Sequence, residues 1–457
     1  MSKYFFCAIA GSGMSALAQI LKMEGHEVCG SDRSFDNNQN LDIKEKFEKN
    51  GIKTYPQNGI GITKDIDFFV ISTAVEETNP EYEKAKKLGL KIIHRSEVLS
   101  EYVSRYQTIA VAGTSGKSTT TAMIWHILNE SGLNPSVING AYINSIMNEK
   151  FLGNAYGGKG KWLVIEADES DSTITRYKPK IGLILNITKD HKPIEELKKI
   201  FSIFISNSET AFINEEDDNC KEIAAKNKNI RLFGKETLNA QIIKTDIFHS
   251  QFKIADIDFH LPIGGLHNIE NAIAAISVTK HLGLSLKDIS KSLLSFKGTF
   301  RRMNLVGEVN GIKIIDDYAH NPAKIEAAVK TVIGACKRAI FIYQPHGYAP
   351  ARMFKNDLVE VFSKLRKEDI LIMPEIYYAG GSVTRDISSK DIIDETIKKG
   401  VKAFYFPNRQ DIKTFISENI KKDDIIMVMG ARDNSLNLFA KEIHRILYEK
   451  NLKAINK

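Results

Sequence analysis

Short apolar runs alternate with amphipathic stretches along nearly the whole chain. Apolar residues gather at 4–11 (YFFCAIAG), 108–113 (TIAVAG) and 425–430 (IIMVMG), and helical spacing follows the first two runs. This alternation predicts parallel β-sheets covered by helices, which is an α/β fold. Between residues 240 and 262 a period of two replaces the helical spacing, so we expect a β-rich segment there.

The domain organisation follows from the breaks in this pattern. A chain of 457 residues is long enough for about three domains. The first strand–helix series closes at residues 104–106, and a new strand begins at Thr108. A second break lies at residues 296–299 (FKGT). We therefore expect domains at residues 1–106, 107–298 and 299–457.

The composition is that of an ordinary globular protein, with 43% hydrophobic and 26% charged residues. No stretch reaches the roughly 18 uninterrupted apolar residues of a membrane span. The N-terminal apolar run ends in glycines rather than at a small-residue cleavage site, which indicates a first β-strand and not a signal peptide. We therefore expect a cytoplasmic protein that does not associate with a membrane.

Cysteine and charge patterns exclude several kinds of site. The four cysteines have no CxxC spacing, which argues against zinc and disulfides and predicts four thiols. The net charge of +7 is spread among interleaved acidic and basic residues, and no nucleic-acid-binding motif is present. We expect no nucleic-acid partner; anionic small substrates would account for the excess of positive charge.

A glycine-rich turn at residues 11–16 (GSGMSA) follows the first strand and opens a helix, and Asp32 ends the next strand. This is a GxGxxA motif in a strand–helix–strand setting, where small residues let the backbone approach a pyrophosphate at a helix N-terminus. The alternative is a tight turn without a ligand. The motif alone does not distinguish NAD, FAD and a UDP-sugar.

The strongest motif is GTSGKSTTT at residues 113–121, which lies between the strand TIAVAG and a helix. Backbone amides of residues 113–117 would surround phosphates, Lys117 would reach the β- and γ-phosphate oxygens, and the Ser118 hydroxyl would bind Mg²⁺. Because position 111 is valine, the loop is a shorter GTxGK[ST] variant. The alternative is a glycine turn capped by threonines.

Acidic residues follow two further strands. Glu166 lies at the end of the strand WLVIEA and Asp168 follows it, and Asp190 and His191 follow IGLILNI. The carboxyl ends of parallel strands are where α/β sheets place their sites, so these groups would hold a metal beside the phosphate loop. The alternatives are a solvated acidic loop and a structural histidine.

Four later motifs are less specific on their own. LHNIENA at 266–272 opens a helix and offers side-chain amides that would pair with the edge of a nucleotide base; the alternative is that Asn268 caps the helix N-terminus. The pair Arg301 and Arg302 at the second boundary would close on phosphates. DDYAHNP at 316–322 and QPHGYAPAR at 344–352 are strand-end loops rich in hydrogen-bonding groups; the alternatives are a turn into a helix and a proline-held loop.

Taken together and in this order, the motifs resemble those of the Mur ligases over essentially the full chain. The match is best with the branch that adds L-alanine to UDP-N-acetylmuramate, which STAVEETNP at 72–80 and RSEVLSE at 95–101 also resemble. The resemblance implies a Rossmann-like UDP-binding domain, a central ATPase domain with a phosphate-binding loop, and a Rossmann-like acceptor-binding domain. It also implies ATP-dependent amide formation through an acyl phosphate in peptidoglycan precursor synthesis, with ATP and Mg²⁺ as cofactors and a monomer or weak homodimer.

The resemblance also assigns roles to individual residues. Those at the nucleotide would be Gly113, Thr114, Ser115, Gly116, Lys117, Ser118 and Thr119 on the phosphates, Asn268 or Asn271 at adenine, Arg302 on the phosphates and Asp317 at the ribose. The metal ligands would be Ser118, Glu166 and His191. Those at the other substrates would be Gly11, Ser12, Gly13, Asp32 and Ser72 along the UDP moiety, and Tyr318, His320, His346 and Arg352 at the reacting groups. The catalytic residues would be Lys117, Arg302, His320 and His346, with His320 as the candidate acceptor of the amine proton.

The sequence departs from the family most clearly in the acceptor region. Where the alanine ligases read QPHRYTRTR, Gly347 and Pro350 replace two arginines and Arg352 remains. Smaller changes are Ser115 and Ser118 in the phosphate loop, DYAHNP for DYGHHP, and a shortened segment after His191. We hypothesise that Arg352 takes over contact with a substrate carboxylate. The sequence leaves three possible acceptors: alanine, another amino acid and a preformed peptide. It also leaves two rival functions, which are an ATP-binding paralogue without ligase activity and a nucleotide-dependent oxidoreductase.

Overall fold

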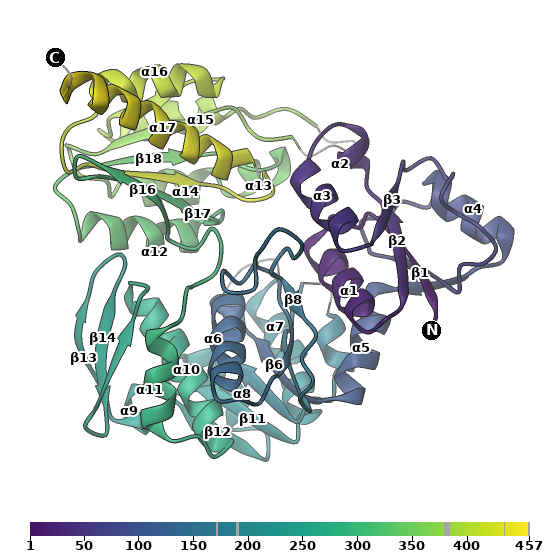
Figure 1. The fold of residues 1–457 in the computed structure, drawn as a ribbon. Helices are drawn as coiled ribbons and strands as arrows, with labels where there is room; N and C mark the ends of the chain where they lie inside the picture. The colour runs from purple at the N-terminus through teal and green to yellow at the C-terminus, as the bar shows by residue number, and fades with distance from the viewer. Residues whose placement is uncertain (171, 189–191, 379–383, 434, 456–457) are drawn as a thin grey trace. The chain divides into compact units, whose positions relative to one another are not determined.

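The chain forms two compact units. The computed structural model describes residues 1–170, 172–188, 192–378, 384–433 and 435–455 (Figure 1). The first unit comprises residues 1–245, 249–262 and 266–300, and the second comprises 301–457 together with 246–248 and 263–265. The second boundary expected from the sequence, at residue 298, lies close to this division.

The first unit begins with a five-stranded parallel sheet in the order β3-β2-β1-β4-β5. Its strands are β1 (Lys3–Cys7), β2 (Glu27–Ser31), β3 (Lys53–Tyr55), β4 (Phe68–Ile71) and β5 (Lys91–His94), and its helices are α1 (Ser12–Met23), α2 (Arg33–Asp36), α3 (Leu41–Lys49), α4 (Pro80–Leu88) and α5 (Arg95–Arg105). Successive residues of a strand face opposite sides, so Phe5 and Phe6 enter two separate apolar clusters. Both faces are therefore buried.

A seven-stranded sheet follows in the order β12-β11-β10-β6-β9-β7-β8, and all its neighbours except β7 and β8 pair in parallel. The strands are β6 (Gln107–Ala112), β7 (Ser136–Ile138), β8 (Ala155–Tyr156), β9 (Trp162–Glu166), β10 (Ile181–Ile184), β11 (Thr210–Asn214) and β12 (Ile230–Phe233). The helical segments are α6 (Lys117–Glu130), η1 (Thr173–Arg176), α7 (Ile194–Ser206), α8 (Asp218–Ala224), α9 (Lys235–Leu238), α10 (Leu266–His281) and α11 (Leu286–Leu294). Helix α6 is buried from Ser118 to Leu128 because β6 and β9 lie on one side of it and α10 and α11 on the other.

The β-rich segment expected between residues 240 and 262 is confirmed as a three-stranded antiparallel sheet. It contains β13 (Ala240–Thr245), β14 (Ser250–Ile254) and β15 (Ile257–Leu261). Phe252 and Phe259 face each other across β14 and β15 and stack with ring centroids 5.1 Å apart. The period of two in the sequence arises because one face of this sheet is buried and the other is solvated.

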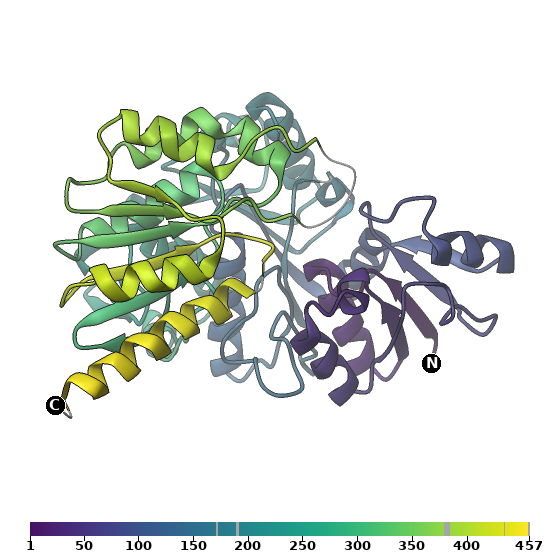
Figure 2. The same cartoon turned by 90° about the horizontal axis from the view of Figure 1, so that it is seen from above.

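The second unit has a six-stranded sheet in the order β16-β17-β21-β18-β19-β20, with only β16 antiparallel. The strands are β16 (Asn304–Val309), β17 (Ile312–Asp317), β18 (Ala339–Tyr343), β19 (Ile370–Met373), β20 (Ala403–Tyr405) and β21 (Ile425–Met429). The helices are α12 (Pro322–Ile333), α13 (Tyr348–Met353), α14 (Lys355–Phe362), α15 (Ser389–Lys398), α16 (Arg409–Asn419) and α17 (Ser435–Ile455). Helices α12, α14 and α15 cover one face of the sheet, and α16 and α17 cover the other (Figure 2).

These sheets confirm the α/β fold predicted from the alternation of apolar runs and helical stretches. All four cysteines are free thiols, as predicted. In the described part of the chain, no helix combines the length and apolarity that crossing a membrane requires.

Candidate active site

The GTSGKSTTT loop lies between β6 and α6, as its spacing predicts. Gly113 and Gly116 have φ angles of 125° and 84°, which side chains other than glycine rarely adopt. A Cβ atom on Gly116 would lie 2.3 Å from the Asn271 side-chain oxygen. Glycine at position 116 therefore allows the loop to pack directly against α10.

Asn186 and Thr188 hold the other side of this loop. The Thr114 hydroxyl lies 2.8 Å from Asn186 Oδ1 and 2.7 Å from the Thr188 hydroxyl. The Ser115 amide donates to Asn186 Oδ1, and the Thr114 amide donates to the Asn186 carbonyl oxygen. The expectation that all amides of residues 113–117 face phosphates is thus wrong for two of them, because Asn186 already accepts from both.

The amides at the start of α6 are better placed for phosphates. The amide of Thr120 donates to the Gly116 carbonyl oxygen, and this is the first hydrogen bond of the helical pattern. The amides of Lys117, Ser118 and Thr119 precede it in the first turn, where backbone donors have no partner within the helix. Together with the positive end of the helix dipole, they make the N-terminus of α6 a suitable place for an anion.

Lys117 forms a buried ion pair with Glu169. Its Nζ lies 2.8 Å from Glu169 Oε2 and donates to the Gly113 carbonyl oxygen, also at 2.8 Å. The two side chains are only 12% and 3% exposed. Burial alone would lower the pKa of Lys117, but the carboxylates of Glu169, Asp168 and Glu166 raise it, so the ammonium group stays charged.

Ser118 and Glu166, two of the three predicted metal ligands, lie together. The Ser118 hydroxyl donates to Glu166 Oε2 at 2.8 Å, and the Gly140 amide donates to the same oxygen at 2.8 Å. A Cβ atom on Gly140 would lie 2.6 Å from that oxygen, so glycine allows the carboxylate to sit against the backbone. The third predicted ligand, His191, lies outside the described residues.

The oxygen atoms of Ser118 and Glu166 suit Mg²⁺, which takes one or two protein oxygen ligands and completes its shell with water and substrate phosphates. Across the described ranges, no three histidine, cysteine or acidic side chains are grouped so that they could hold a metal by themselves. A hydroxyl and a carboxylate beside a phosphate-binding helix N-terminus are therefore consistent with a metal that the nucleotide helps to bind.

Asn268 and Asn271 both lie inside α10, so Asn268 does not cap that helix. Asn271 accepts from the Thr120 hydroxyl at 3.2 Å, and its amide donates to Asn268 Oδ1 at 3.3 Å. Both side chains are buried. The structure therefore connects Asn271 to the loop, while contact of either residue with adenine stays a prediction.

The predicted UDP residues gather at the carboxyl ends of β1, β2 and β4. Gly11 precedes α1, while Ser12 and Gly13 form its first turn, and Ser72 follows β4. Asp32 caps α2 through Ser34 and also accepts from the Ala10 amide at 2.9 Å, which ties the ends of two strands together. These contacts give Asp32 a structural task, and its contact with UDP stays a prediction.

Sequence reasoning missed Arg95, which lies against the same turn. A Cβ atom on Gly13 would lie 2.8 Å from Arg95 Nη1. Burial opposes the lowered pKa of Asp168, while Lys117, hydrogen bonds from Ser170 and, as the smallest of these causes, the positive charge of Arg95 lower it. The signal available in the sequence was the position of Arg95 at the end of β5, at the same sheet edge as Gly13.

In the second unit, Arg301 and Arg302 have different surroundings. Arg301 is buried, donates to both carboxylate oxygens of Asp316 at 3.1 and 3.0 Å, and also donates to the Gly430 and Asp433 carbonyl oxygens. Arg302 is partly exposed, with its guanidinium 5.4 Å from the Tyr318 ring centroid. Arg301 therefore anchors the chain, and Arg302 is the one available to a ligand.

Asp317, predicted to face the ribose, is buried and accepts from two backbone amides. Those of Met303 and Ala319 each donate to a different carboxylate oxygen at 2.7 Å. Met303 has a φ of 47°, so one of these bonds holds a backbone conformation that is otherwise unfavourable. The structure shows Asp317 shaping the chain around Arg302, and contact with a ribose stays a prediction.

Tyr318, His320 and His346 come together at the carboxyl ends of β17 and β18. The rings of Tyr318 and His320 lie 5.5 Å apart, and those of His320 and His346 lie 5.1 Å apart. His320 Nδ1 is 2.9 Å from the Tyr318 carbonyl oxygen. Because a carbonyl only accepts, Nδ1 carries the proton and Nε2 carries the lone pair.

Burial lowers the pKa of His320 to about 2, and the positive charges of Lys324 and Arg302 together with His346 act in the same direction. The imidazole is therefore neutral throughout the physiological pH range. A neutral histidine can accept a hydrogen bond from an amine, but with so low a pKa it is a weak base. This arrangement favours orientation of the amine over storage of its proton.

Arg352 is on α13 and pairs with Asp386 rather than standing alone. Its Nε donates to Asp386 Oδ1 at 3.1 Å, and its Nη2 donates to the same oxygen and to the Thr384 carbonyl oxygen. Both side chains are about half exposed. The hypothesis that Arg352 contacts a substrate carboxylate is therefore weakened, because Asp386 already neutralises its charge.

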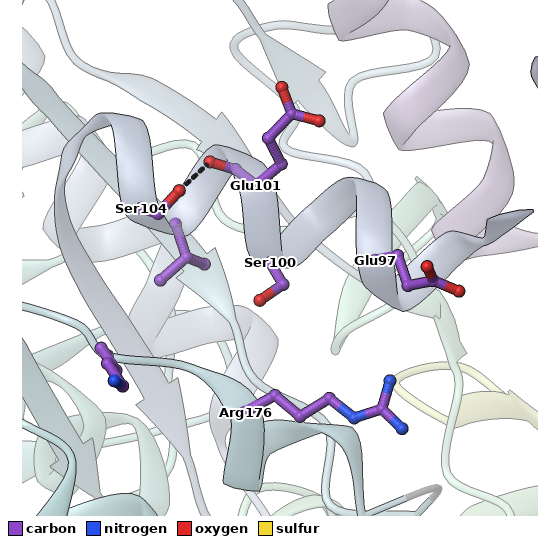
Figure 3. Close-up of a pocket in the computed structure, with 7 residues that line it drawn as sticks. Glu97, Ser100, Glu101, Ser104 and Arg176 are labelled. Carbon is purple, nitrogen blue, oxygen red and sulfur yellow. Dashed lines mark hydrogen bonds between the residues drawn. The ribbon is translucent and has the colours of Figure 1, made fainter.

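A separate depression lies between α5 and the residues at and just after the end of η1. It is lined by Glu97, Ser100, Glu101, Val103, Ser104, Arg176 and Lys178. In Figure 3, Ser100 points toward the side of Arg176, and Glu101 points away from it. The depression contains none of the predicted site residues and mixes charges of both signs.

The first unit thus presents a phosphate-binding loop with a charged lysine and a hydroxyl–carboxylate pair, which defines a nucleotide-binding α/β protein. Family models match the chain in three consecutive parts: the Mur ligase family catalytic domain at residues 3–107, the Mur ligase middle domain at 111–279 and the Mur ligase glutamate ligase domain at 301–432. The chain belongs to the Mur ligase family, and it is an ATP-dependent ligase with the three-domain architecture of that family.

Curated relatives extend the similarity over nearly the whole chain. UDP-N-acetylmuramate–L-alanine ligase from Agathobacter rectalis is 35% identical over 455 residues, covering 93% of this chain and 94% of that protein. The enzyme of the same name from Caldicellulosiruptor saccharolyticus is also 35% identical, over 95% of this chain and 96% of its own length. The solved UDP-N-acetylmuramate–alanine ligase from Thermotoga maritima has the same fold, with a TM-score of 0.80, 23% identity and coverage of 98% and 100%.

Proposed function

We propose that this chain is a UDP-N-acetylmuramate–L-alanine ligase that acts in peptidoglycan precursor synthesis. Similarity to the enzymes of that name over more than nine-tenths of both chains is the observation that supports this substrate pair most strongly. The phosphate-binding loop with Lys117 supports use of ATP. We also infer that the enzyme acts in the cytoplasm as a monomer or weak homodimer.

In the first step, the substrate carboxylate attacks the γ-phosphorus of ATP, and ADP leaves. Lys117 and the first-turn amides of α6 hold the phosphates, and Arg302 adds a second positive charge. Mg²⁺, when held by Ser118 and Glu166, would neutralise phosphate charge. The nucleotide moieties would contact Asn268 or Asn271 and Asp317. The UDP moiety would lie along the turn formed by Gly11, Ser12 and Gly13, with Asp32 and Ser72 beside it.

In the second step, the amine of the amino acid attacks the carbonyl carbon of the acyl phosphate and the bond to phosphate breaks. The nitrogen loses a proton to the departing phosphate, and an amide forms. His320 and His346 face the place of this reaction in the second unit. His320 accepts a hydrogen bond from the amine through Nε2 and orients its lone pair toward the carbonyl carbon. No enzyme nucleophile is needed, so catalysis consists of positioning and charge neutralisation.

The products of the nucleotide test this chemistry. With ATP, Mg²⁺ and UDP-N-acetylmuramate, addition of an amino acid should release ADP and phosphate in equal amounts, because the γ-phosphoryl group is transferred to a carboxylate. Chromatography of the nucleotides measures this directly. Formation of AMP and pyrophosphate would place the chain in a different ligase chemistry.

His320→Gln should separate the two steps. The variant should still form the acyl phosphate, which hydroxylamine traps as a hydroxamate in the absence of an amino acid. It should form amide at least tenfold more slowly, since the amine is no longer oriented. Equal loss of hydroxamate and amide would contradict the assignment of His320 to the second step.

The same variant should change the response of stability to pH. An unfolded histidine gains a proton near pH 6.5, whereas the partly buried His320 stays neutral down to about pH 2. Stability is therefore lost as pH falls below about 6.5, by up to about 1.4 kcal/mol per pH unit. Between pH 6.5 and 4 the apparent Tm should fall less steeply for His320→Gln than for the unaltered protein, and parallel curves would refute the burial effect.

A second candidate function, ATP binding without ligation, is supported by one observation. Gly347 and Pro350 lack the two acceptor-side arginines of the alanine ligases, and Arg352 is already paired with Asp386. Such a protein would bind ATP and release no ADP with any acceptor. The alternative of a nucleotide-dependent oxidoreductase leaves the phosphate-binding loop with Lys117 unexplained. Titration with UDP and with NADH distinguishes an oxidoreductase from a ligase, because a ligase of this kind should bind UDP and not NADH.

A further inference from the structure

A single arginine in the second unit rests on two tyrosine rings beside the altered acceptor loop. The Arg385 guanidinium lies 4.1 Å from the Tyr378 ring centroid and 5.9 Å from that of Tyr348. The two rings are 6.3 Å apart. Tyr348 belongs to QPHGYAPAR, so this cation stands next to the very loop in which Gly347 and Pro350 replace arginines.

Backbone pairing fixes the two tyrosines beside each other. The Gly347 amide donates to the Tyr377 carbonyl oxygen at 2.9 Å, and the Tyr377 amide donates to the Pro345 carbonyl oxygen at 2.8 Å. His346 and Tyr377 thereby form a parallel bridge. Tyr348, two residues after His346, and Tyr378, directly after Tyr377, are held side by side as a result.

The Arg352–Asp386 pair fixes the segment that carries Arg385. Arg352 on α13 binds the Asp386 carboxylate and the Thr384 carbonyl oxygen, which are the two neighbours of Arg385 in the chain. The hydrogen bond from Arg352 also lowers the pKa of Asp386, which keeps it ionised. The arginine that remains from the family motif therefore serves as a tether.

Of Arg352, Arg385 and Arg409, which lie in the segments after β18, β19 and β20, Arg385 is the one whose charge is not already neutralised by a residue that the structure describes. Arg352 pairs with Asp386, and Arg409 pairs with Asp433. Within the described ranges, Arg385 makes no ion pair, and its side chain is exposed. An aromatic ring occupies one face of a guanidinium and leaves the N–H groups at its edge available for a carboxylate.

The topology places this cation on the same side of the sheet as the reacting groups. His320 follows β17, His346 follows β18, and Tyr378 and Arg385 follow β19. These three strands run parallel in one sheet, so the residues after them emerge at one edge. An amino acid whose amine faces the histidines would present its carboxylate toward the loops after β18 and β19.

We propose that Arg385 binds the carboxylate of the incoming amino acid and that Arg352 is a positioning residue that holds Arg385 in place. This assignment rests on the proposed ligase function. Tyr348 and Tyr378 orient the guanidinium so that two parallel N–H groups meet the two carboxylate oxygens. Arg385 thus replaces, from a different loop, the positive charge that is absent at positions 347 and 350.

The test compares L-alanine with L-alaninamide, which has the amine and the methyl group but no carboxylate. Arg385→Ala should raise the KM for L-alanine roughly ten- to a hundredfold, the loss expected for a charge-assisted hydrogen bond. It should leave the KM for L-alaninamide and for ATP unchanged. The KM of Arg385→Lys for L-alanine should lie between those of the unaltered protein and of Arg385→Ala. An ammonium group keeps the positive charge but lacks the paired N–H groups of a guanidinium.

Two further variants separate binding from positioning. Asp386→Asn should raise the KM for L-alanine less than Arg385→Ala does, because it releases the tether and leaves the guanidinium present. Arg445→Ala, which removes an exposed arginine from α17, should change no parameter. Hydroxylamine trapping without an amino acid should be normal in all variants, since acyl phosphate formation does not involve Arg385.

An unchanged KM for L-alanine in Arg385→Ala overturns the proposal, and so does an equal rise for L-alanine and L-alaninamide. Absence of both hydroxamate and amide in the unaltered protein would instead refute the ligase function. A lower Tm for Arg385→Ala than for Arg445→Ala would indicate that Arg385 also has a structural role. In that case Arg385→Gln, which keeps packing on the tyrosines, must also raise the KM for L-alanine but not for L-alaninamide, and failure to do so overturns the proposal.

Discussion

Replacement of Lys117 by methionine should reduce the rate of ADP formation at least a thousandfold. The ammonium group is the positive charge held at the end of the phosphate-binding loop, and three nearby carboxylates keep it protonated. Methionine keeps most of the side-chain volume and removes the charge that the transferred phosphoryl group requires. The measurement is ADP release at saturating ATP and UDP-N-acetylmuramate.

The control for this variant must account for Glu169. Loss of Lys117 leaves a carboxylate that is 3% exposed without its partner, and breaking a buried pair costs about 3–5 kcal/mol. We therefore expect Lys117→Met to lower the Tm, and Lys117→Met combined with Glu169→Gln to restore it without restoring activity. Glu169→Gln alone and Lys159→Met, at an exposed position, serve as references. Activity of the double variant near that of Glu169→Gln would refute the phosphate-loop assignment.

Gly116→Ala should lower kcat/KM for ATP at least a hundredfold. The added Cβ would lie 2.3 Å from Asn271 Oδ1, and the φ angle of 84° disfavours any side chain. Either the loop moves away from α10 or the first turn of α6 is distorted, and both displace the amides that would hold phosphates. Steady-state kinetics with varied ATP measure the effect.

Gly132 provides a matched control because it also has a positive φ angle, 76°, yet a Cβ there would meet nothing within 4 Å. Gly132→Ala should cost about 1 kcal/mol of stability from backbone strain and leave kcat/KM for ATP unchanged. Equal kinetic effects of the two substitutions would show that strain, and not the contact with Asn271, is responsible.

The sequence predicts those parts of the site that depend on local pattern. The strand, glycine turn and helix around Lys117 follow one another directly in the chain, so their spacing was sufficient. The same holds for the glycine turn at Gly11 and for the antiparallel segment at residues 240–262. In each case the period of the apolar residues and the positions of the glycines determine the local structure.

Contacts between distant segments were not predictable in the same way. Asn186 holds the phosphate loop because β10 lies beside β6, and Glu166 reaches Ser118 because β9 lies on the other side. The order of strands in a sheet is not encoded in the period of one segment. The difference between Arg301 and Arg302 was equally hidden, because positive φ angles at Arg301 and Met303 interrupt the regular alternation of side chains.

The acceptor region shows why motif comparison alone is insufficient. QPHGYAPAR suggests that Arg352 inherits the task of the missing arginines, since it is the remaining cation in that motif. The structure pairs Arg352 with Asp386 and brings Arg385 beside Tyr348 from a loop more than thirty residues further along the chain. Because the loops after β18 and β19 pair with each other, Arg385 rather than Arg352 is the arginine left without an acidic partner among the described residues there.

The central claim is that this chain joins L-alanine to UDP-N-acetylmuramate, and an acceptor panel tests it most directly. The protein should be incubated with ATP, Mg²⁺, UDP-N-acetylmuramate and, in turn, each amino acid and an L-alanyl-γ-D-glutamyl-diaminopimelate tripeptide, with product masses recorded. The account predicts an amide product whose kcat/KM is highest for L-alanine, with one ADP released per amide formed. A higher value for the tripeptide or for another amino acid, or no amide with any acceptor, would contradict it.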